Sequence, residues 1–424
     1  MQQTSKKSLS NTLPILVTSL ILAACGGGGS SEPQGVPPAN GSLTSPIAAK
    51  ATSYANKNSM SGQLTMPAYN SATPFYRIVG NWAFMAIGTA DFFQTGSNDM
   101  FTAIVNYESW TPSQYTRAVV DKDPSLMSDF KFWHRNTDGT LVELWTAKGC
   151  LHPRKAAIAD FNKDGYPDVF VACTGWDSDE FPGETNRLVL SDGKGGFTVK
   201  EVGPVAYTHT ASAADINGDG YPDVVVAGMG FGHWSAANPQ PTGDNNTTML
   251  MNNKDGTFTV DNTRIPMAKY SGGHMGDVEL VDVDGDGYID FIGGTHGLNA
   301  WSPPAAIYYG NKDGYFTGRM DVIPAVVGRS VMLDFILTND GGKRGMYIGR
   351  TSDGLDTLND YATTTVQYLD LSTMKSTVLL DSINNQTGRG NVVPFWIPAV
   401  RNGVSGIVPI ATDYDYGHWF VTNK

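Results

Sequence analysis

One nine-residue acidic pattern occurs three times in this chain, starting at residues 160, 215 and 282. Each copy places Asp or Asn at positions 1, 3, 5 and 9 and glycine at position 6. Oxygen side chains at this spacing are typical of a loop that surrounds a hard cation such as calcium, and the glycine permits the sharp turn. The pattern therefore predicts three calcium ions. Their expected ligands, with the tyrosine at position 7 included, are Asp160, Asn162, Asp164, Tyr166, Asp168, Asp215, Asn217, Asp219, Tyr221, Asp223, Asp282, Asp284, Asp286, Tyr288 and Asp290.

An EF-hand is the first alternative for these loops. Its bidentate Glu at position 12 is missing, because that position holds Val171, Val226 or Gly293. Pro167 and Pro222 also stand where the helix after the loop would begin its second turn. Short apolar runs flank each loop instead, which predicts a strand, a loop and a second strand. A turn rich in Asp and Asn that binds no metal is the remaining alternative.

Composition favours an all-β protein. The 424 residues include 48 glycines and 23 prolines, only 17% are charged, and no long helical periodicity follows residue 25. The net charge of −12 argues against nucleic acid or an anionic membrane surface as the partner. Much of that charge lies in the three loops, where bound metal would neutralise it.

The N-terminal residues indicate export. Lys6 and Lys7 precede an apolar stretch, residues 13–24, which is shorter than the roughly 20 residues of a spanning helix. This order is typical of a signal peptide, predicted here over residues 1–24. The following Cys25 resembles the lipidated cysteine of bacterial lipoproteins, which implies a lipid anchor in the cell envelope, on the periplasmic or the surface side of the outer membrane. Residues 25–60 then read as a flexible tether and residues 61–424 as the folded domain.

Two further cysteines remain, Cys150 and Cys173. In an oxidising compartment they can form a disulfide, which would close a loop of 23 residues and contribute about 3 kcal/mol. Two buried free thiols are the alternative.

The acidic loops belong to longer repeats. After each strand–loop–strand unit come two more short runs separated by a glycine turn, such as 187–190 and 197–200; in the third repeat the last run begins at Phe316. Four strands in a repeat of this length are typical of a β-propeller blade. Residues 150–320 resemble the integrin-type FG-GAP, or VCBS, repeats, whose blades carry this calcium loop between their first two strands.

Weaker repeats flank that region. Residues 86–145 and 331–381 each predict four strands, and residues 395–421 predict three strands of a further blade. We therefore expect a six-bladed, integrin-like β-propeller, with seven blades as the alternative. A strand at 62–66 or 75–79 would complete the last blade and remove an open edge. The loop at 91–99 keeps positions 1, 6 and 9 but has Phe93 and Thr95 at positions 3 and 5, so we expect no calcium there.

Most histidines and several tryptophans fall at the strand ends opposite the calcium loops. A flat aromatic ring beside His and polar groups suits a sugar, although the same residues are common in ordinary loops. The candidate ligand residues are Trp176, His209, His233, Trp234, His274, His296, His418 and Trp419. A histidine metal site lacks support, because no helical His spacing accompanies them.

Three classes of function remain. The sequence contains no nucleophile elbow, phosphate loop or paired-cysteine zinc site, so a protein that binds a glycan or a protein ligand, as in adhesion, is favoured over an enzyme. The enzymatic alternative is a polysaccharide lyase or glycoside hydrolase, because FG-GAP-like propellers also carry such activities. The third class is a structural subunit of an envelope assembly.

Overall fold

The computed structural model describes residues 85–97, 99–104, 123–137, 141–176, 183–228, 247–266, 275–295, 304–340, 343–352, 362–383, 395–401, 404–410 and 420–421. All of them belong to one compact unit, Pro37–Lys424. None of these residues lies in a helix with the length and apolar character needed to cross a bilayer. The predicted signal peptide, the tether and the strands expected at 62–66 and 75–79 lie outside the described residues.

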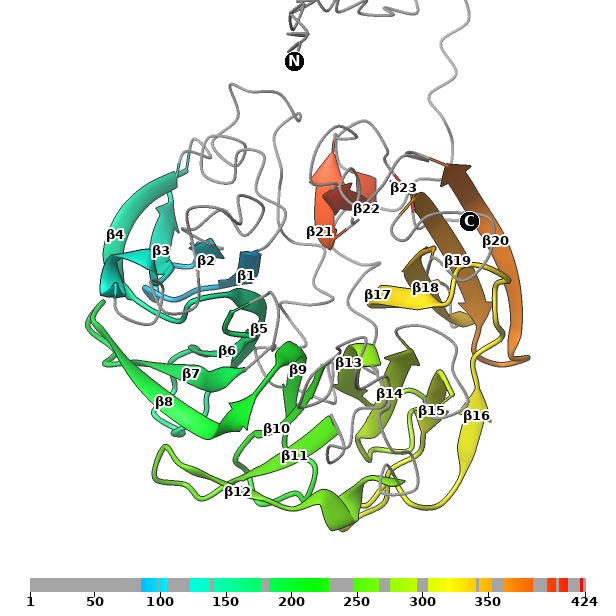
Figure 1. Ribbon diagram of the computed structural model, residues 1–424, viewed down its shortest axis with the longest axis horizontal. Helices are drawn as coiled ribbons and strands as arrows, with labels where there is room; N and C mark the ends of the chain where they lie inside the picture. Colours follow the sequence, from blue (N-terminus) through cyan, green and yellow to red (C-terminus); the bar gives the residue numbers. More distant parts are fainter. Residues whose placement is uncertain are drawn as a thin grey trace, which may run out of the picture. The chain divides into compact units, whose positions relative to one another are not determined.

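The described residues form antiparallel sheets in which consecutive strands are neighbours (Figure 1). Five sheets have four strands and the last has three. The first three sheets contain β1 (Met85–Ala90), β2 (Asp99–Ile104), β3 (Asp129–Arg135) and β4 (Leu141–Lys148); β5 (Pro153–Ala159), β6 (Asp168–Cys173), β7 (Glu184–Ser191) and β8 (Phe197–Ala206); and β9 (Thr208–Ala214), β10 (Asp223–Gly228), β11 (Thr247–Asn252) and β12 (Phe258–Val260).

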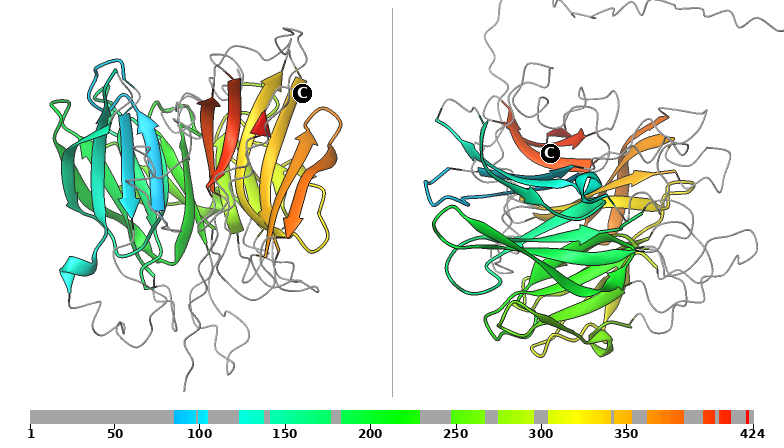
Figure 2. Two further views of the ribbon diagram at one scale, coloured as in Figure 1. Left: turned by 90° about the horizontal axis from the view of Figure 1, so that it is seen from above. Right: turned by 60° about the vertical axis from the view of Figure 1, so that its left-hand side comes forward.

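The other sheets contain β13 (Met275–Val281), β14 (Asp290–Thr295), β15 (Ala306–Tyr308) and β16 (Met320–Val322); β17 (Val331–Asp340), β18 (Lys343–Thr351), β19 (Thr363–Asp370) and β20 (Lys375–Ile383); and β21 (Phe395–Arg401), β22 (Val404–Ile410) and β23 (Phe420–Val421). Two 3-10 turns, η1 (Pro124–Leu126) and η2 (Asn262–Arg264), lie in the connections. The all-β prediction is confirmed. Figure 2 shows the strands of each sheet side by side and alternating in direction.

Successive sheets pack face to face, and alternate residues of one strand serve two different cores. On β6, Val169 and Val171 join a cluster with β1–β4, whereas Phe170 and Ala172 join a cluster with β9–β12. Successive side chains of a strand point to opposite faces, so a strand between two sheets must be apolar on both. This is why β6 and β10 are continuous apolar runs rather than alternating ones.

The first strands of neighbouring sheets lie beside one another. β1 packs beside β5, β5 beside β9, β9 beside β13, β13 beside β17, and β17 beside β21. Small residues permit this close approach: β5 contains Ala156, Ala157 and Ala159, and β9 contains Ala211 and Ala213, all buried. The loop that follows each first strand is thereby placed at one end of its sheet.

One predicted strand was wrong. Phe316 is not the start of the fourth strand of its sheet, because β16 covers Met320–Val322. Phe316 is fully buried, and its ring centroid lies 6.0 Å from that of Phe291. Its backbone N–H donates to the carbonyl of Arg264 in η2 at 2.8 Å, so this stretch bonds to the preceding sheet's connection rather than extending its own sheet.

Candidate functional site

The three acidic loops, 160–168, 215–223 and 282–290, share one backbone conformation. Position 4 has a positive φ in each: 63° at Lys163, 72° at Gly218 and 80° at Gly285. Position 6 is a glycine at φ of 90°, 92° and 97°. This left-handed region is unfavourable for residues that carry a Cβ, so Gly at position 6 is required by the turn, as predicted.

The carboxylate at position 1 closes the turn on itself. Asp160 accepts from the N–H of Asp164 at 3.1 Å and from the N–H of Gly165 at 2.9 Å. Asp215 accepts from the same two positions of its loop, at 3.0 and 2.8 Å. In the third loop, Asp282 accepts from the N–H groups of Gly285 and Gly287, at 2.6 and 3.0 Å.

The carboxylate at position 9 fastens the loop to its sheet. Asp168 is fully buried at the start of β6 and accepts from the N–H of Phe161 at 2.9 Å and from the N–H of Ser191, at the end of β7, at 2.8 Å. Asp223 and Asp290 make the corresponding pairs of bonds, to Ile216 with Asn252 and to Val283 with Gly310. Burial, together with nearby carboxylates, raises the pKa of Asp168 to about 8 and those of Asp223 and Asp290 to about 7.

Positions 3 and 5 place further side-chain oxygens at the exposed rim of the loop. Asp164 accepts from the N–H of Tyr166 at 2.9 Å and from the amide of Asn162 at 2.9 Å. In the third loop, carboxylate oxygens of Asp282, Asp284 and Asp290 lie within 4.8 Å of one another. A set made only of oxygen atoms, with negative charge on three or four of them, fits a hard cation such as calcium. Tyr288 at position 7 is 43% exposed, and its side chain projects to solvent.

The loop at 91–99 has the same frame, meaning the turn held by positions 1, 6 and 9. It lacks the rim, meaning the side-chain oxygens that positions 3 and 5 supply in the other loops. Asp91 accepts from the N–H groups of Thr95 and Gly96, both at 2.8 Å, and Gly96 has a φ of 78°. Asp99 is buried and accepts from the N–H groups of Phe93 and Arg135. His134 Nδ1 also lies 2.8 Å from Asp99 Oδ1. The turn thus forms with two carboxylates only, one of them facing a histidine.

Two of the acidic loops lie in the part of the chain that matches known protein families. The FG-GAP-like repeat family matches residues 160–226, and the FG-GAP repeat family matches residues 207–247. This chain carries FG-GAP repeats. The matched residues contain the first two acidic loops and strands β6 to β10. No curated protein matches the chain.

Solved structures with some likeness are remote. The major allergen Mala s 1 of Malassezia sympodialis is 12% identical, with a TM-score of 0.37 over 62% of this chain and 72% of its own. Sqt1 of Saccharomyces cerevisiae is 9% identical, with a TM-score of 0.34 over 77% of this chain and 69% of its own. A GH74 enzyme of Niastella koreensis is 11% identical, with a TM-score of 0.23 over 80% of this chain and 68% of its own. At these TM-scores the likenesses carry no argument about this chain.

A buried charged network joins the three sheets that carry acidic loops. Lys155 Nζ on β5 donates to Asp277 Oδ1 at 2.6 Å and to Glu279 Oε1 at 2.8 Å, both on β13. Thr210 and Ser212 of β9, which lies between them, donate to the same two carboxylates at 2.5 and 2.8 Å. Burial raises the pKa of Glu279, and the charge of Lys155 opposes this. Its single ammonium group faces two carboxylates, and the network links three consecutive repeats.

Sequence reasoning missed this network. A signal was present, because Lys155, Thr210 and Asp277 each stand five residues before the first Asp of a loop, and Ser212 and Glu279 stand three before it. Polar residues at matching places in otherwise apolar strands indicate a shared inner edge. Only the stacking of the sheets shows that these side chains meet.

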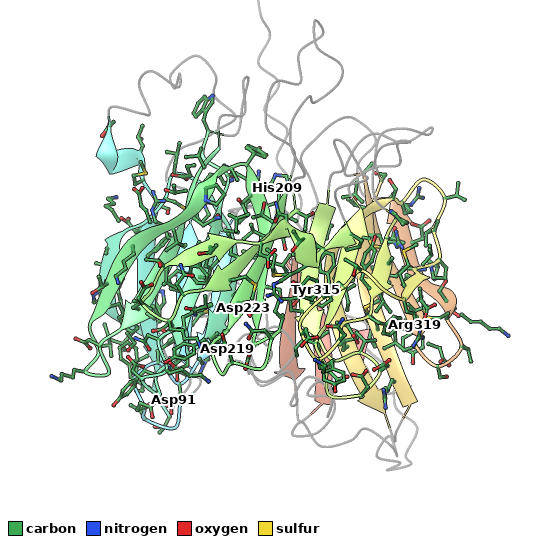
Figure 3. The ribbon with its side chains drawn as sticks, turned by 90° about the horizontal axis from the view of Figure 1, so that it is seen from below. Asp91, His209, Asp219, Asp223, Tyr315 and Arg319 are labelled. Atoms are coloured by element: carbon green, nitrogen blue, oxygen red, sulfur yellow. A yellow bond between two sulfur atoms is a disulfide. The ribbon has the colours of Figure 1, made fainter. Side chains whose placement is uncertain are left out.

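Two of the eight predicted ligand residues lie within the described residues. His209 is half-buried in β9, with its ring centroid 5.1 Å from that of Tyr207. Figure 3 shows His209 and the loop residue Asp219 at opposite ends of their sheet. Trp176 is only 8% exposed, so its indole is largely packed into the protein, and its role as a ligand residue stays a prediction. The other six, His233, Trp234, His274, His296, His418 and Trp419, lie outside the described residues or among those whose side chains are not described.

A disulfide joins Cys150 to Cys173, with the sulfur atoms 2.19 Å apart. Cys150 lies between β4 and β5, and Cys173 ends β6. Both are fully buried in the core between the first two sheets. Of the two alternatives left by the sequence, the structure has the bridge.

Proposed function

We propose that this protein is a calcium-stabilised β-propeller of six blades, in which the three acidic loops each hold one Ca²⁺. The cation would be held by the side-chain oxygens of positions 1, 3, 5 and 9. It would compensate the negative charge of these carboxylates, and thereby stabilise each loop on its sheet. The order of the sheets, with each first strand beside the next, supports the propeller arrangement.

The observation that carries the proposal is the buried carboxylate at position 9. Asp168, Asp223 and Asp290 are 0–1% exposed, and each faces two further carboxylates of its own loop. Burying a charged group among like charges is costly unless a cation compensates. In the 91–99 loop, where positions 3 and 5 are not acidic, the corresponding Asp99 faces His134 instead.

Calcium titration of the chelator-treated protein tests the proposal. Isothermal titration calorimetry should give three equivalents, and thermal unfolding should shift upward on adding calcium, because a ligand present at 100 times its Kd adds about 2.7 kcal/mol for each site. Asp219→Ala should remove one equivalent, whereas Asp91→Asn should remove none. No binding at millimolar calcium would overturn the proposal.

We further propose that the protein is exported, anchored in the cell envelope through lipidated Cys25, and binds a glycan or protein at the strand ends opposite the loops. His209 occupies that end of β9. A glycan array run with and without chelator, with product analysis of every hit, separates a binding protein from a polysaccharide lyase or hydrolase. Trp234→Ala and His209→Ala should abolish or weaken a specific signal; unchanged binding in both would overturn this location.

Anchoring has its own test. Cys25→Ser should move the protein from the membrane fraction to the soluble fraction with its thermal unfolding unchanged. Continued membrane association of that variant would contradict the lipid anchor.

A further inference from the structure

The second acidic loop faces a basic side chain from its own sheet. Lys254 Nζ lies 3.3 Å from Asp219 Oδ2, the carboxylate at position 5. It also lies 5.2 Å from the ring centroid of Tyr221, at position 7. Lys254 stands in the turn between β11 and β12, where its φ is 70°. An ammonium group therefore lies against one carboxylate of the proposed calcium site.

The third loop also faces a basic side chain, an arginine that contacts position 3 and also pairs with Asp321 at 2.8 Å. Arg319 Nη1 lies 3.6 Å from Asp284 Oδ2, at position 3, and its guanidinium carbon is 3.8 Å from the ring centroid of Tyr309. Arg319 comes from the connection between β15 and β16, which corresponds to the connection that carries Lys254. Figure 3 labels Asp219 and Arg319 on the two sheets concerned.

The first loop is the natural control. Its ligands have the same residue types at positions 1, 3, 5, 7 and 9 as those of the second loop. In the part of the chain that the structure describes, no basic side chain forms an ion pair with Asp160, Asp164 or Asp168. The corresponding turn presents Gly193 to Tyr166, so closely that a Cβ there would lie 2.3 Å from the ring. Lys194 of that turn makes no ion pair with the loop.

We infer that Lys254 is a built-in counterion that lowers the metal affinity of the second loop below that of the first, and that Arg319 acts in the same way on the third. This inference rests on the proposed calcium binding. A metal ion entering the second loop must displace or repel the ammonium group that Asp219 already attracts. Repulsion between a divalent ion and a unit charge a few ångströms away, in largely aqueous surroundings, corresponds to roughly a five- to tenfold loss of affinity at low salt. Matched loops would then fill at different calcium concentrations.

The experiment compares Lys254→Gln with Lys194→Gln by calcium calorimetry on the whole protein at low ionic strength. Asp219→Ala first identifies the equivalent that belongs to the second loop. Lys254→Gln should raise the affinity of that equivalent about five- to tenfold, by the charge argument above, while Lys194→Gln changes nothing. Lys254→Arg, which keeps the charge, should behave as the parent.

Salt gives a second readout. Added KCl screens the lysine, so the difference between the parent and Lys254→Gln should shrink as ionic strength rises. Three equivalents with second-loop affinity within twofold of the parent in Lys254→Gln would overturn the counterion role and leave calcium binding intact. Failure of every loop to bind calcium in the parent would overturn both proposals.

Discussion

The acidic loop 160–168 and the loop 91–99 have the same frame and different rims. Both hold a left-handed residue at position 4, a left-handed glycine at position 6, a position 1 carboxylate on the N–H groups of positions 5 and 6, and a buried position 9 carboxylate fixed to the sheet. They differ at positions 3 and 5, where Asn162 and Asp164 are replaced by Phe93 and Thr95. The turn therefore forms with positions 1, 6 and 9 alone and does not depend on the side-chain oxygens of positions 3 and 5.

The buried carboxylate at position 9 also has different neighbours in the two loops. His134, at the end of β3, stands beside Asp99 at 2.8 Å. Asp168 has Asp160 and Asp164 for neighbours, and these raise its pKa further beyond the effect of burial. One loop carries a histidine beside its carboxylate, and for the other we propose that a bound cation takes this place. Five expectations follow from this contrast, in order of decreasing effect.

Removing position 9 should damage both loops. Asp168→Ala and Asp99→Ala each leave two backbone N–H groups without their acceptor, which should lower the free energy of unfolding by about 3 kcal/mol in chelator. Urea unfolding with and without calcium should show a further loss in calcium for Asp168→Ala only. A calcium-dependent loss in Asp99→Ala would show that the 91–99 loop also binds metal.

Substitution at position 5 should lower the stability of one loop and hardly affect the other. With calcium at 100 times its Kd, Asp164→Ala should lose about 2.7 kcal/mol of stability, because one site no longer contributes. Thr95→Ala should change stability by less than about 0.5 kcal/mol, as is usual for an exposed position. In chelator the two variants should be alike; a large loss for Asp164→Ala there would mean that its carboxylate is structural.

The metal-free protein should lose stability as pH rises. The pKa values of Asp168, Asp223 and Asp290 are raised to about 8, 7 and 7 by burial and neighbouring carboxylates, above the unfolded value of about 3.9. The folded state then binds more protons between pH 4 and these pKa values, so the free energy of unfolding falls as pH rises across that range. Urea unfolding at pH 5.5 and pH 8.5 in chelator measures this. Saturating calcium should abolish the slope, and an unchanged slope would contradict calcium at these carboxylates.

Restoring the rim should create a site. Phe93→Asn with Thr95→Asp gives the 91–99 loop the oxygen ligands of the first loop, and we expect one additional calcium equivalent. At calcium five times its Kd this would add about 1 kcal/mol. Phe93→Asn alone is the control and should bind no extra metal. Three equivalents in the double variant would indicate that His134 prevents binding, and adding His134→Gln would test this.

The smallest effect concerns the backbone. Lys163 and Gln94 occupy position 4 with φ of 63° and 56°, where the second and third loops have glycine. Replacing a left-handed residue by glycine relieves about 1 kcal/mol of backbone strain in the folded state. Glycine also raises the entropy of the unfolded chain, which lowers stability by a similar amount. Lys163→Gly and Gln94→Gly should therefore each change stability by about 0.5 kcal/mol or less, with calcium stoichiometry unchanged. A loss of calcium binding in Lys163→Gly would mean that this side chain contributes to the site.

Elements that depend on near neighbours in the chain were predictable from the sequence alone. The acidic loops were predictable because their ligands and glycines stand within nine residues of one another. The strands around them were predictable because apolar runs bounded by turns need no distant partner to be recognised. Phe93 and Thr95 alone were enough to set the 91–99 loop apart from the three acidic loops. The fourth strand expected at Phe316 was wrong, because the ring of Phe316 packs in the core against Phe291. Its backbone N–H donates to the carbonyl of Arg264 rather than to a neighbouring strand.

The packing of the sheets sets which distant groups meet. Lys155 contacts Asp277 across 122 residues, and His134 reaches Asp99 across 35. The packing also leaves Trp176 largely inside the protein and places Lys254 against Asp219, whereas Lys194 stands against no loop carboxylate. Periodicity specifies which face of a strand is buried, but the stacking of whole sheets specifies which charges share that face. For that reason the loops were evident from the sequence, and the charges that neutralise or oppose them were not.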